Sequence, residues 1–201
     1  MALKDAKSDY IIKVAKDLFL EKGINSVTIK DVALKAEMGE VTIYRYFSKK
    51  ENLVVQAAIA LEQEVFSKYF SVDHNLSGYV QIERFYNSFL DVFNNMRNYF
   101  RFVHDFDSLV VANHLKVEEY EKNIYNYYQV FMEAYNKGLE DGSVKKLVDP
   151  NLFYMATSHS ILSLCVKMAS DDVLVQDHNN DKTKEICVLI LIIMNSLIPQ
   201  K

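Results

Sequence analysis

The stretch Thr28 to Leu53, TIKDVALKAEMGEVTIYRYFSKKENL, decides the fold, because it holds two short helical patterns separated by three residues. Thr28-x-x-Asp31 can form a capping box that begins the first of these helices. The break Glu37-Met38-Gly39 precedes a very short second helix from Glu40 to Phe47. Two short helices joined by such a turn predict a helix-turn-helix, in which the second helix enters the major groove of DNA.

The second helix has a predicted core side and a predicted reading side. Ile43 and Phe47 lie four residues apart and should face the core. Val41 and Arg45 then point away from the core, and Thr42 and Tyr44 lie on the flanks. A helix of two turns is not stable alone, so the preceding helix is expected to pack across both short helices. That helix has its apolar stripe at Ile11, Val14, Ala15 and Leu18, and it ends at Gly23.

The rest of the chain predicts further helices, about nine in all, and no strand. Only 5 glycines and 2 prolines are present, which is too few for a turn-rich all-β fold. Ser48 to Glu51 reads as a second capping box, and Asp149-Pro150 as an N-cap with proline at the first helical position. The later helices are expected to run from Ser48 to about Phe70, from after Gly78 to about Phe93, from after Asn98 to near Ala112, from Val117 to Leu139, from Pro150 to about Ala169, and from Thr183 to Leu197. The polar breaks between them are Ser71 to Gly78, Asn94 to Asn98, and Ser170 to Asp181.

Charge and composition are those of a cytoplasmic globular protein. The net charge is −4, but the chain up to Leu53 has ten basic and eight acidic residues, so the remainder holds all of the negative excess. The N-terminal part therefore suits a phosphate surface better. We expect no signal peptide in Met1 to Ser8 and no membrane span in Ile186 to Met194. Cys165 and Cys187 are expected to be buried thiols in a reducing compartment.

The quoted stretch and the helix before it resemble the DNA-binding domain of the TetR/AcrR family of bacterial transcriptional regulators. The matching residues are Ala15, Leu18-Phe19, Gly23, Thr28-Ile29, Val32-Ala33, Thr42 to Phe47, Lys50-Glu51 and Leu53. The resemblance covers about a quarter of the chain. It implies a helix-turn-helix DNA-binding domain over residues 1–48 and a helical effector-binding and dimerisation domain over residues 49–201.

Three positions depart from the common family pattern. Glu37 and Val41 stand where glycine is usual, and Gly39 stands where a serine N-cap is usual. Glycine is an acceptable N-cap. A left-handed conformation at Glu37 would cost roughly 1–2 kcal/mol. These changes leave the fold intact, while Val41 alters the face that reads DNA.

The resemblance also implies which residues contact DNA. Thr28 and Lys30 correspond to contacts with the backbone or an adjacent base, and Tyr44 and Lys50 to phosphate contacts. The residues expected to meet base edges or nearby phosphates are Glu40, Val41, Thr42, Arg45 and Tyr46. Arg45 is the expected base reader, because a bidentate arginine–guanine pair contributes roughly 1–3 kcal/mol of discrimination.

The residues after the head are rich in aromatic side chains at helical spacing. Helices of this kind can enclose an apolar cavity with a few hydroxyls, although any one aromatic is more often ordinary core. The residues predicted to line an effector pocket are Phe85, Phe89, Phe93, Phe102, His104, Phe106, Tyr125 and Tyr128. As a group they favour a flat, apolar or aromatic effector.

Other chemistry has little support in the sequence. His104 and Asp107 are three residues apart and could together bind a metal or an effector, but surface charge or a helix–helix hydrogen bond is the commoner role of such a pair. We therefore predict no metal and no cofactor. No phosphate-binding loop, dinucleotide fingerprint, zinc-protease motif or nucleophile elbow is present, so an enzyme is not expected.

The last two helices are predicted to form the interface of a homodimer. Their apolar residues recur at Leu152, Met155, Ala156, His159, Leu162 and Val166, and at Ile186, Leu189, Ile190, Ile193 and Leu197. The final helix is apolar all round and needs cover on every side, from a second copy or from its own domain.

The function expected from the resemblance is repression. A dimer would bind a near-palindromic double-stranded DNA operator and leave it when an unknown small-molecule effector binds. The sequence leaves open an architectural or activating role in which DNA binding is independent of ligand.

Overall fold

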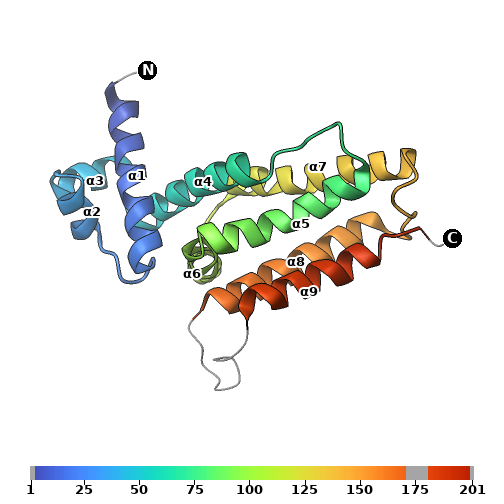
Figure 1. Cartoon of the computed structure of the whole chain (residues 1–201). Helices are drawn as coiled ribbons and strands as arrows, with labels where there is room; N and C mark the ends of the chain where they lie inside the picture. Colours follow the sequence, from blue (N-terminus) through green and yellow to red (C-terminus); the bar gives the residue numbers. More distant parts are fainter. Residues whose placement is uncertain (1–2, 171–180, 200–201) are drawn as a thin grey trace. The chain divides into compact units, whose positions relative to one another are not determined.

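The computed structural model describes residues 3–170 and 181–199, and these ranges contain helices and no strands (Figure 1). The helices are α1 (Leu3–Lys22), α2 (Ile29–Lys35), α3 (Glu40–Phe47), α4 (Lys50–Tyr69), α5 (Gly78–Asn95), α6 (Asn98–Asn113), α7 (Glu118–Glu140), α8 (Pro150–Ala169) and α9 (Lys182–Asn195). The predicted all-α class is confirmed. Most of the loop expected over Ser170 to Asp181 lies outside the described residues.

One predicted helix start is right and another is wrong. The Asp149 side chain accepts a hydrogen bond from the backbone N–H of Leu152 at 2.9 Å, and Pro150 occupies the first turn, as expected. Ser48, in contrast, is not the N-cap of α4. It ends α3 with a φ of 61°, and α4 begins at Lys50. Ser48 takes this role because only two residues separate the helices, and its N–H still donates to the carbonyl of Tyr44 in the last turn of α3.

The described chain forms two compact units. The first unit holds the residues up to Glu64 together with Arg101–Asn123, and the second holds Val65–Phe100 and the residues from Ile124 onward. Consequently α4, α6 and α7 each have residues in both units. These units differ from the division at residue 48, which concerns function and stays a prediction.

The first unit contains the predicted three-helix head. α1 packs on α2, and α2 packs on α3. Asp105 of α6 accepts a hydrogen bond from the backbone N–H of Ile24 at 3.3 Å, which holds α6 against the connection between α1 and α2. Asn123 of α7 donates to the carbonyl of Ile59 in α4. The first unit is therefore larger than a helix-turn-helix.

The second unit is built around aromatic side chains. α5 packs against α8 and α9, which lie side by side (Figure 1). The ring of Phe70 lies 5.6, 5.2 and 4.6 Å from the rings of Phe85, Phe89 and Tyr127, in edge-to-face contacts. Such contacts are favourable beyond the area that they bury.

The start of α5 lies directly against the end of α7. A Cβ atom at Gly78 would be only 2.1 Å from the backbone nitrogen of Gly138, so two glycines make this close approach possible. The backbone N–H of Gly78 donates to the Asp141 carboxylate at 2.8 Å. These contacts position the segment that joins α4 to α5. No helix within the described ranges is long and apolar enough to cross a membrane.

The two cysteines differ in burial. Cys165 of α8 is buried, as expected, and its burial raises the pKa of the thiol to about 12. Cys187 of α9 is exposed in the single chain, so the expectation that it is buried is wrong. The difference arises because α9 is apolar on all sides, and its sequence does not reveal which side faces the core.

Candidate nucleic-acid interface

The start of α2 is fixed by the predicted capping box. The Thr28 hydroxyl accepts from the backbone N–H of Asp31 at 3.2 Å, and the Asp31 carboxylate accepts from the hydroxyl and the backbone N–H of Thr28 at 2.6 and 2.7 Å. These hydrogen bonds lower the pKa of Asp31 below its ordinary value. Thr28 and Lys30 are both exposed, so the cap leaves this end of α2 open to a ligand.

The turn between α2 and α3 requires a left-handed residue at position 37. Glu37 has a φ of 55°. Its N–H donates to the carbonyl of Leu34 at 3.2 Å, and the N–H of Met38 donates to the carbonyl of Ala33 at 2.9 Å. This is the Schellman arrangement that usually employs glycine. The left-handed backbone considered for Glu37 from the sequence is thus present.

α3 presents the two faces that its sequence predicts. Ile43 and Phe47 are buried, whereas Val41 is 82% exposed and Tyr44 48% exposed. Arg45 is exposed, and its guanidinium carbon lies 5.6 Å from the centre of the Tyr46 ring. Glu40 is exposed, and Thr42 and Tyr46 are half-buried. All the α3 residues that the sequence predicts to contact DNA are therefore accessible to solvent, and only the two anchoring residues are buried.

Lys50 holds the head together. Its ammonium donates to the backbone carbonyl of Ile24 at 2.6 Å, and partial burial lowers its pKa. Asn52, near the start of α4, donates to the carbonyl of Phe47 at 2.9 Å and so closes the end of α3. The phosphate contact expected of Lys50 stays a prediction, and in the free protein this lysine makes a structural bond.

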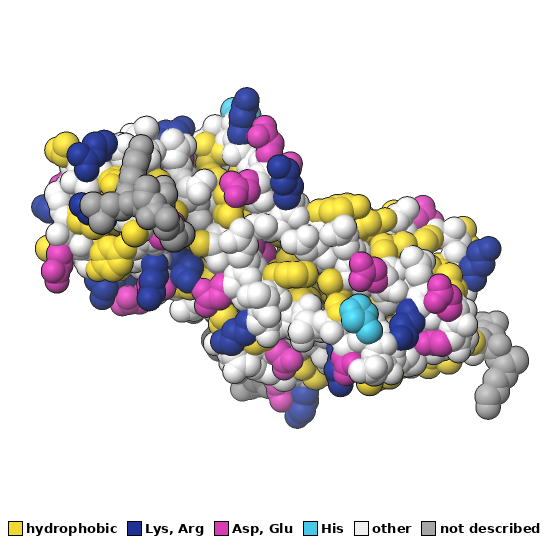
Figure 2. Space-filling model, turned by 90° about the horizontal axis from the view of Figure 1, so that it is seen from above, with side chains coloured by type: hydrophobic (Ala, Val, Ile, Leu, Met, Phe, Trp, Pro, Cys, Tyr) yellow, Lys and Arg dark blue, Asp and Glu magenta, His cyan; other side chains and the backbone are white. Residues whose placement is uncertain are grey.

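On the face shown in Figure 2, lysine and arginine side chains are scattered over the part of the protein at the left. They alternate with acidic and apolar side chains rather than forming one continuous patch. This distribution agrees with the small positive excess of the sequence up to Leu53.

The predicted effector residues do not all lie in one unit. Phe102, His104 and Phe106 belong to the first unit, where the rings of Phe102 and Phe106 stack 6.1 Å apart and His104 is exposed. The other five lie in the second unit: Phe85, Phe89 and Phe93 are buried, Tyr125 is exposed, and Tyr128 is half-buried with its hydroxyl donating to Asn151.

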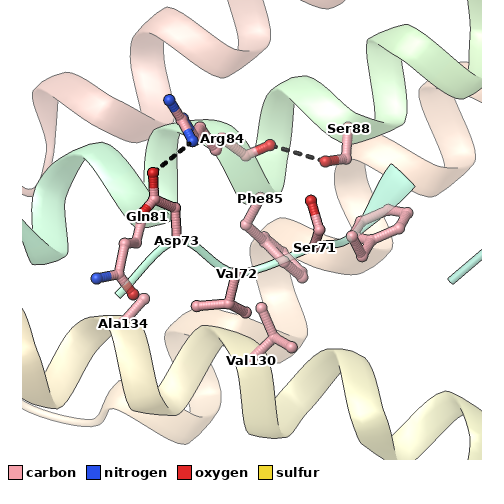
Figure 3. A pocket seen from close by; sticks show the side chains of 10 residues that line it. Ser71, Val72, Asp73, Gln81, Arg84, Phe85, Ser88, Val130 and Ala134 are labelled. Atoms are coloured by element: carbon pink, nitrogen blue, oxygen red, sulfur yellow. Dashed lines mark hydrogen bonds and ion pairs between the residues drawn. The ribbon is translucent and has the colours of Figure 1, made fainter. Parts of the chain in front are cut away.

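A small cavity lies in the second unit (Figure 3). It is enclosed by α5, by α7 and by the segment that follows α4. Its volume is about 10 Å³, which is about the space of one water molecule. Apolar side chains line it beside polar groups of Ser71, Gln81, Arg84 and Ser88. Of the eight predicted effector residues, all of which are described, only Phe85 lines this cavity.

Polar contacts hold the segment 70–77 over α5. The guanidinium of Arg84 lies 3.6 Å from the Asp73 carboxylate (Figure 3). Ser88 donates to the carbonyl of Tyr69 at 2.7 Å, and Gln81 donates to the carbonyl of Leu76 at 2.9 Å. Sequence reasoning missed these residues, because their positions depend on how the loop folds back and not on helical spacing.

His104 and Asp107, for which the sequence allows a metal or an effector, both lie on α6. Within the described residues, no set of three or more His, Cys, Asp or Glu side chains is arranged to hold a metal ion. Partial burial raises the pKa of the Asp107 carboxyl.

The last two helices leave one apolar face uncovered in the single chain. Leu152 and Met155 of α8 are exposed, as are Val188, Leu191 and Ile192 of α9. The residues predicted for the interface in and after α9 behave differently: Ile186, Ile190 and Ile193, and Leu197 just after the helix, are buried within the chain, and Leu189 is half-buried. They pack inward because α5 and α8 cover that side of α9.

Comparisons with known proteins agree with this architecture. Residues 11–57 match a family model described as bacterial regulatory proteins, tetR family. The chain is 22% identical over 152 residues to the HTH-type transcriptional repressor KstR2 of Rhodococcus jostii (strain RHA1), covering 75% of this chain and 74% of that repressor.

Two solved structures have the same fold. The ketosteroid transcriptional regulator KstR2 of Mycobacterium tuberculosis has a TM-score of 0.65 at 15% identity, covering 96% of this chain and 95% of that one. The fatty acid degradation regulator FadR from Bacillus halodurans has a TM-score of 0.64 at 16% identity, with coverage of 95% and 96%.

Replacing Glu37 with glycine should stabilise the head. Glycine adopts the left-handed backbone without the side-chain penalty, so the free energy of unfolding should rise by about 1 kcal/mol. Lys35→Gly, two residues earlier at the last position of α2, is the matched control and should lower the free energy of unfolding, by up to about 1 kcal/mol. Urea denaturation at fixed protein concentration measures both, and equal destabilisation by the two glycines would refute strain at Glu37.

Proposed function

Because this chain belongs to the TetR family of bacterial transcriptional regulators, we propose that it is a homodimeric repressor that leaves its operator when a small-molecule effector binds. The observation that carries this proposal is the exposed face of α3. It presents Val41, Tyr44 and Arg45 from a helix that is anchored by Ile43 and Phe47. The protein would act in the cytoplasm, by binding and not by catalysis.

The proposed DNA contacts divide into base reading and backbone positioning. Arg45 would pair with a guanine in the major groove, with Val41 beside it to contact apolar base edges. Tyr44 and Lys30 would contact phosphates of the DNA backbone on either side of the bases that α3 reads. Their exposure supports these roles, since each side chain reaches solvent without any change in the fold.

The proposed dimer would form through the exposed apolar face of α8 and α9. Val188, Leu191 and Ile192 lie on one side of α9, opposite the side buried in the chain. A second copy that places the same face against it would remove this apolar surface from water and give a four-helix interface. Two heads related by a twofold axis would then read two half-sites of a near-palindrome.

The proposed effector is apolar. The second unit encloses its small cavity beside a cluster of aromatic rings, and apolar walls with a few polar groups are typical of small-molecule sites. The cavity has room for about one water, so an effector must displace side chains to enter. Of the two solved structures, one regulator is named for ketosteroids and the other for fatty acid degradation.

Effector binding would weaken DNA binding through the helices shared by the units. α4 begins beside the head and ends in the second unit, so a displacement of its far end can be carried along one continuous helix. If that changes the separation of the two heads, the operator no longer fits both. By linkage, the operator must weaken effector binding by the same factor.

Arg45→Ala tests base reading. The variant should lose about 1–3 kcal/mol of preference at one base pair of each half-site while keeping its affinity for unrelated DNA. Arg101→Ala, an exposed arginine of α6, is the matched control and should keep the preference. Fluorescence anisotropy with single-base operator variants measures both. Equal weakening of all sequences by Arg45→Ala would contradict the base-reading role.

Leu191→Lys tests the dimer. A lysine in the centre of the proposed interface would bury an unpaired charge, so the dimer dissociation constant should rise at least roughly 100-fold. Val111→Lys, which alters another exposed aliphatic residue, should leave the dimer intact. Sedimentation velocity over a concentration series distinguishes the two. A Leu191→Lys protein that dimerises like the wild type would exclude this face as the interface.

A further inference from the structure

A groove in the first unit lies beside the recognition helix, outside the helix-turn-helix. It is bounded by the start of α1, the last turn of α3, the first turns of α4 and the connection between α6 and α7, and its volume is about 690 Å³. Its polar lining includes Ser8, Lys49, Asn52, Gln56, His114 and Lys116. Three separate parts of the sequence thus meet at one hollow.

The lining of this groove is basic. Lys49, Lys116 and His114 contribute to it, and no aspartate or glutamate does, although acidic residues outnumber basic ones in the chain. Within the described residues, neither lysine forms an ion pair. Cationic groups gathered without a carboxylate favour an anion as the ligand.

The backbone around the groove is held in unusual conformations. Ser48 and His114 have φ values of 61° and 48°, and within the described residues Glu37 is the only other non-glycine residue with a positive φ. The N–H of Leu115 donates to the carbonyl of Val110 at 3.1 Å, which closes α6 and fixes the direction of the chain into Lys116. Strained residues of this kind concentrate at functional sites.

The position of the groove identifies the anion. Tyr46 and Phe47, in the last turn of α3, form one wall, and Lys49 follows soon after them. When a recognition helix lies in the major groove, its ends and the residues after it face the phosphates that border that groove. A backbone phosphate is therefore the anion that the proposed DNA binding brings to this place.

We propose that this groove receives a backbone phosphate of the operator, held by Lys49 and Lys116, with His114 beside it. Lys116 and His114 lie far beyond the recognition helix in sequence, and they extend the DNA contact past the helix-turn-helix. The inference rests on the proposed function, since it needs the head to bind DNA.

The experiment measures how DNA affinity depends on salt. Removing one phosphate contact reduces the slope of log K against log salt concentration by about 0.9. A dimer carries two copies of the site, so Lys116→Ala should flatten the slope by about two. Lys49→Ala should do the same, and Lys116→Arg should restore the wild-type slope. Lys122→Ala, an exposed lysine of α7 that does not line the groove, is the matched control.

The outcomes separate this inference from the proposed function. A Lys116→Ala protein with the affinity and slope of Lys122→Ala overturns the inference and leaves sequence-specific binding standing. A second result would also overturn the inference: calorimetry shows that inorganic phosphate binds the wild type but not Lys116→Ala, while both proteins bind DNA equally. The groove would then bind a free anion and not the DNA backbone. A wild-type protein that binds no DNA overturns both. Thermal melting establishes that each variant is folded.

Discussion

The burial of Ile43 and Phe47 is the constraint on which the rest of the first unit depends. α3 has eight residues, too few to be helical in isolation, so its shape is imposed by what it packs against. The connection between α1 and α2 is tied down at Ile24: the N–H of this residue donates to Asp105, and its carbonyl accepts from Lys50. The connection before α2 is thus held from both α4 and α6, while Ile43 and Phe47 anchor α3 and leave its reading face exposed.

That double tie explains why the first unit extends beyond the head. Asp105 belongs to α6, so the segment Arg101–Asn123 forms part of the same compact unit as the helix-turn-helix. α4, α6 and α7 each continue into the second unit. In the proposed mechanism, α4 and α6 would both carry a displacement from an effector to the residues around Ile24, because each has residues in the second unit and a bond to Ile24.

Helical spacing and end signals were sufficient to predict most of the fold. The capping box of Thr28 and the proline start at Pro150 depend on bonds between residues close in sequence, and the structure contains both. The Ser-x-x-Glu pattern at Ser48 suits an N-cap, but the backbone N–H of Ser48 donates to Tyr44, so this residue ends α3 instead.

The parts of the site that sequence did not predict depend on tertiary contacts. The inward and outward faces of α9 could not be told apart, since the helix is apolar all round. Three other features bring together residues that are far apart in the sequence, so no local pattern predicts them. They are the hydrogen bond from Lys50 to Ile24, the cavity that Arg84 lines, and the groove at Lys116.

Selection of bound sequences from random duplex DNA, with the purified protein at moderate salt, tests the central claim most directly. An exposed α3 face presented by each subunit of a dimer should enrich a near-palindrome, with half-sites whose centres lie one helical turn apart or a multiple of it. Failure of a folded, dimeric protein to enrich any sequence would contradict the claim, because an exposed face presented twice by the dimer would then read no sequence.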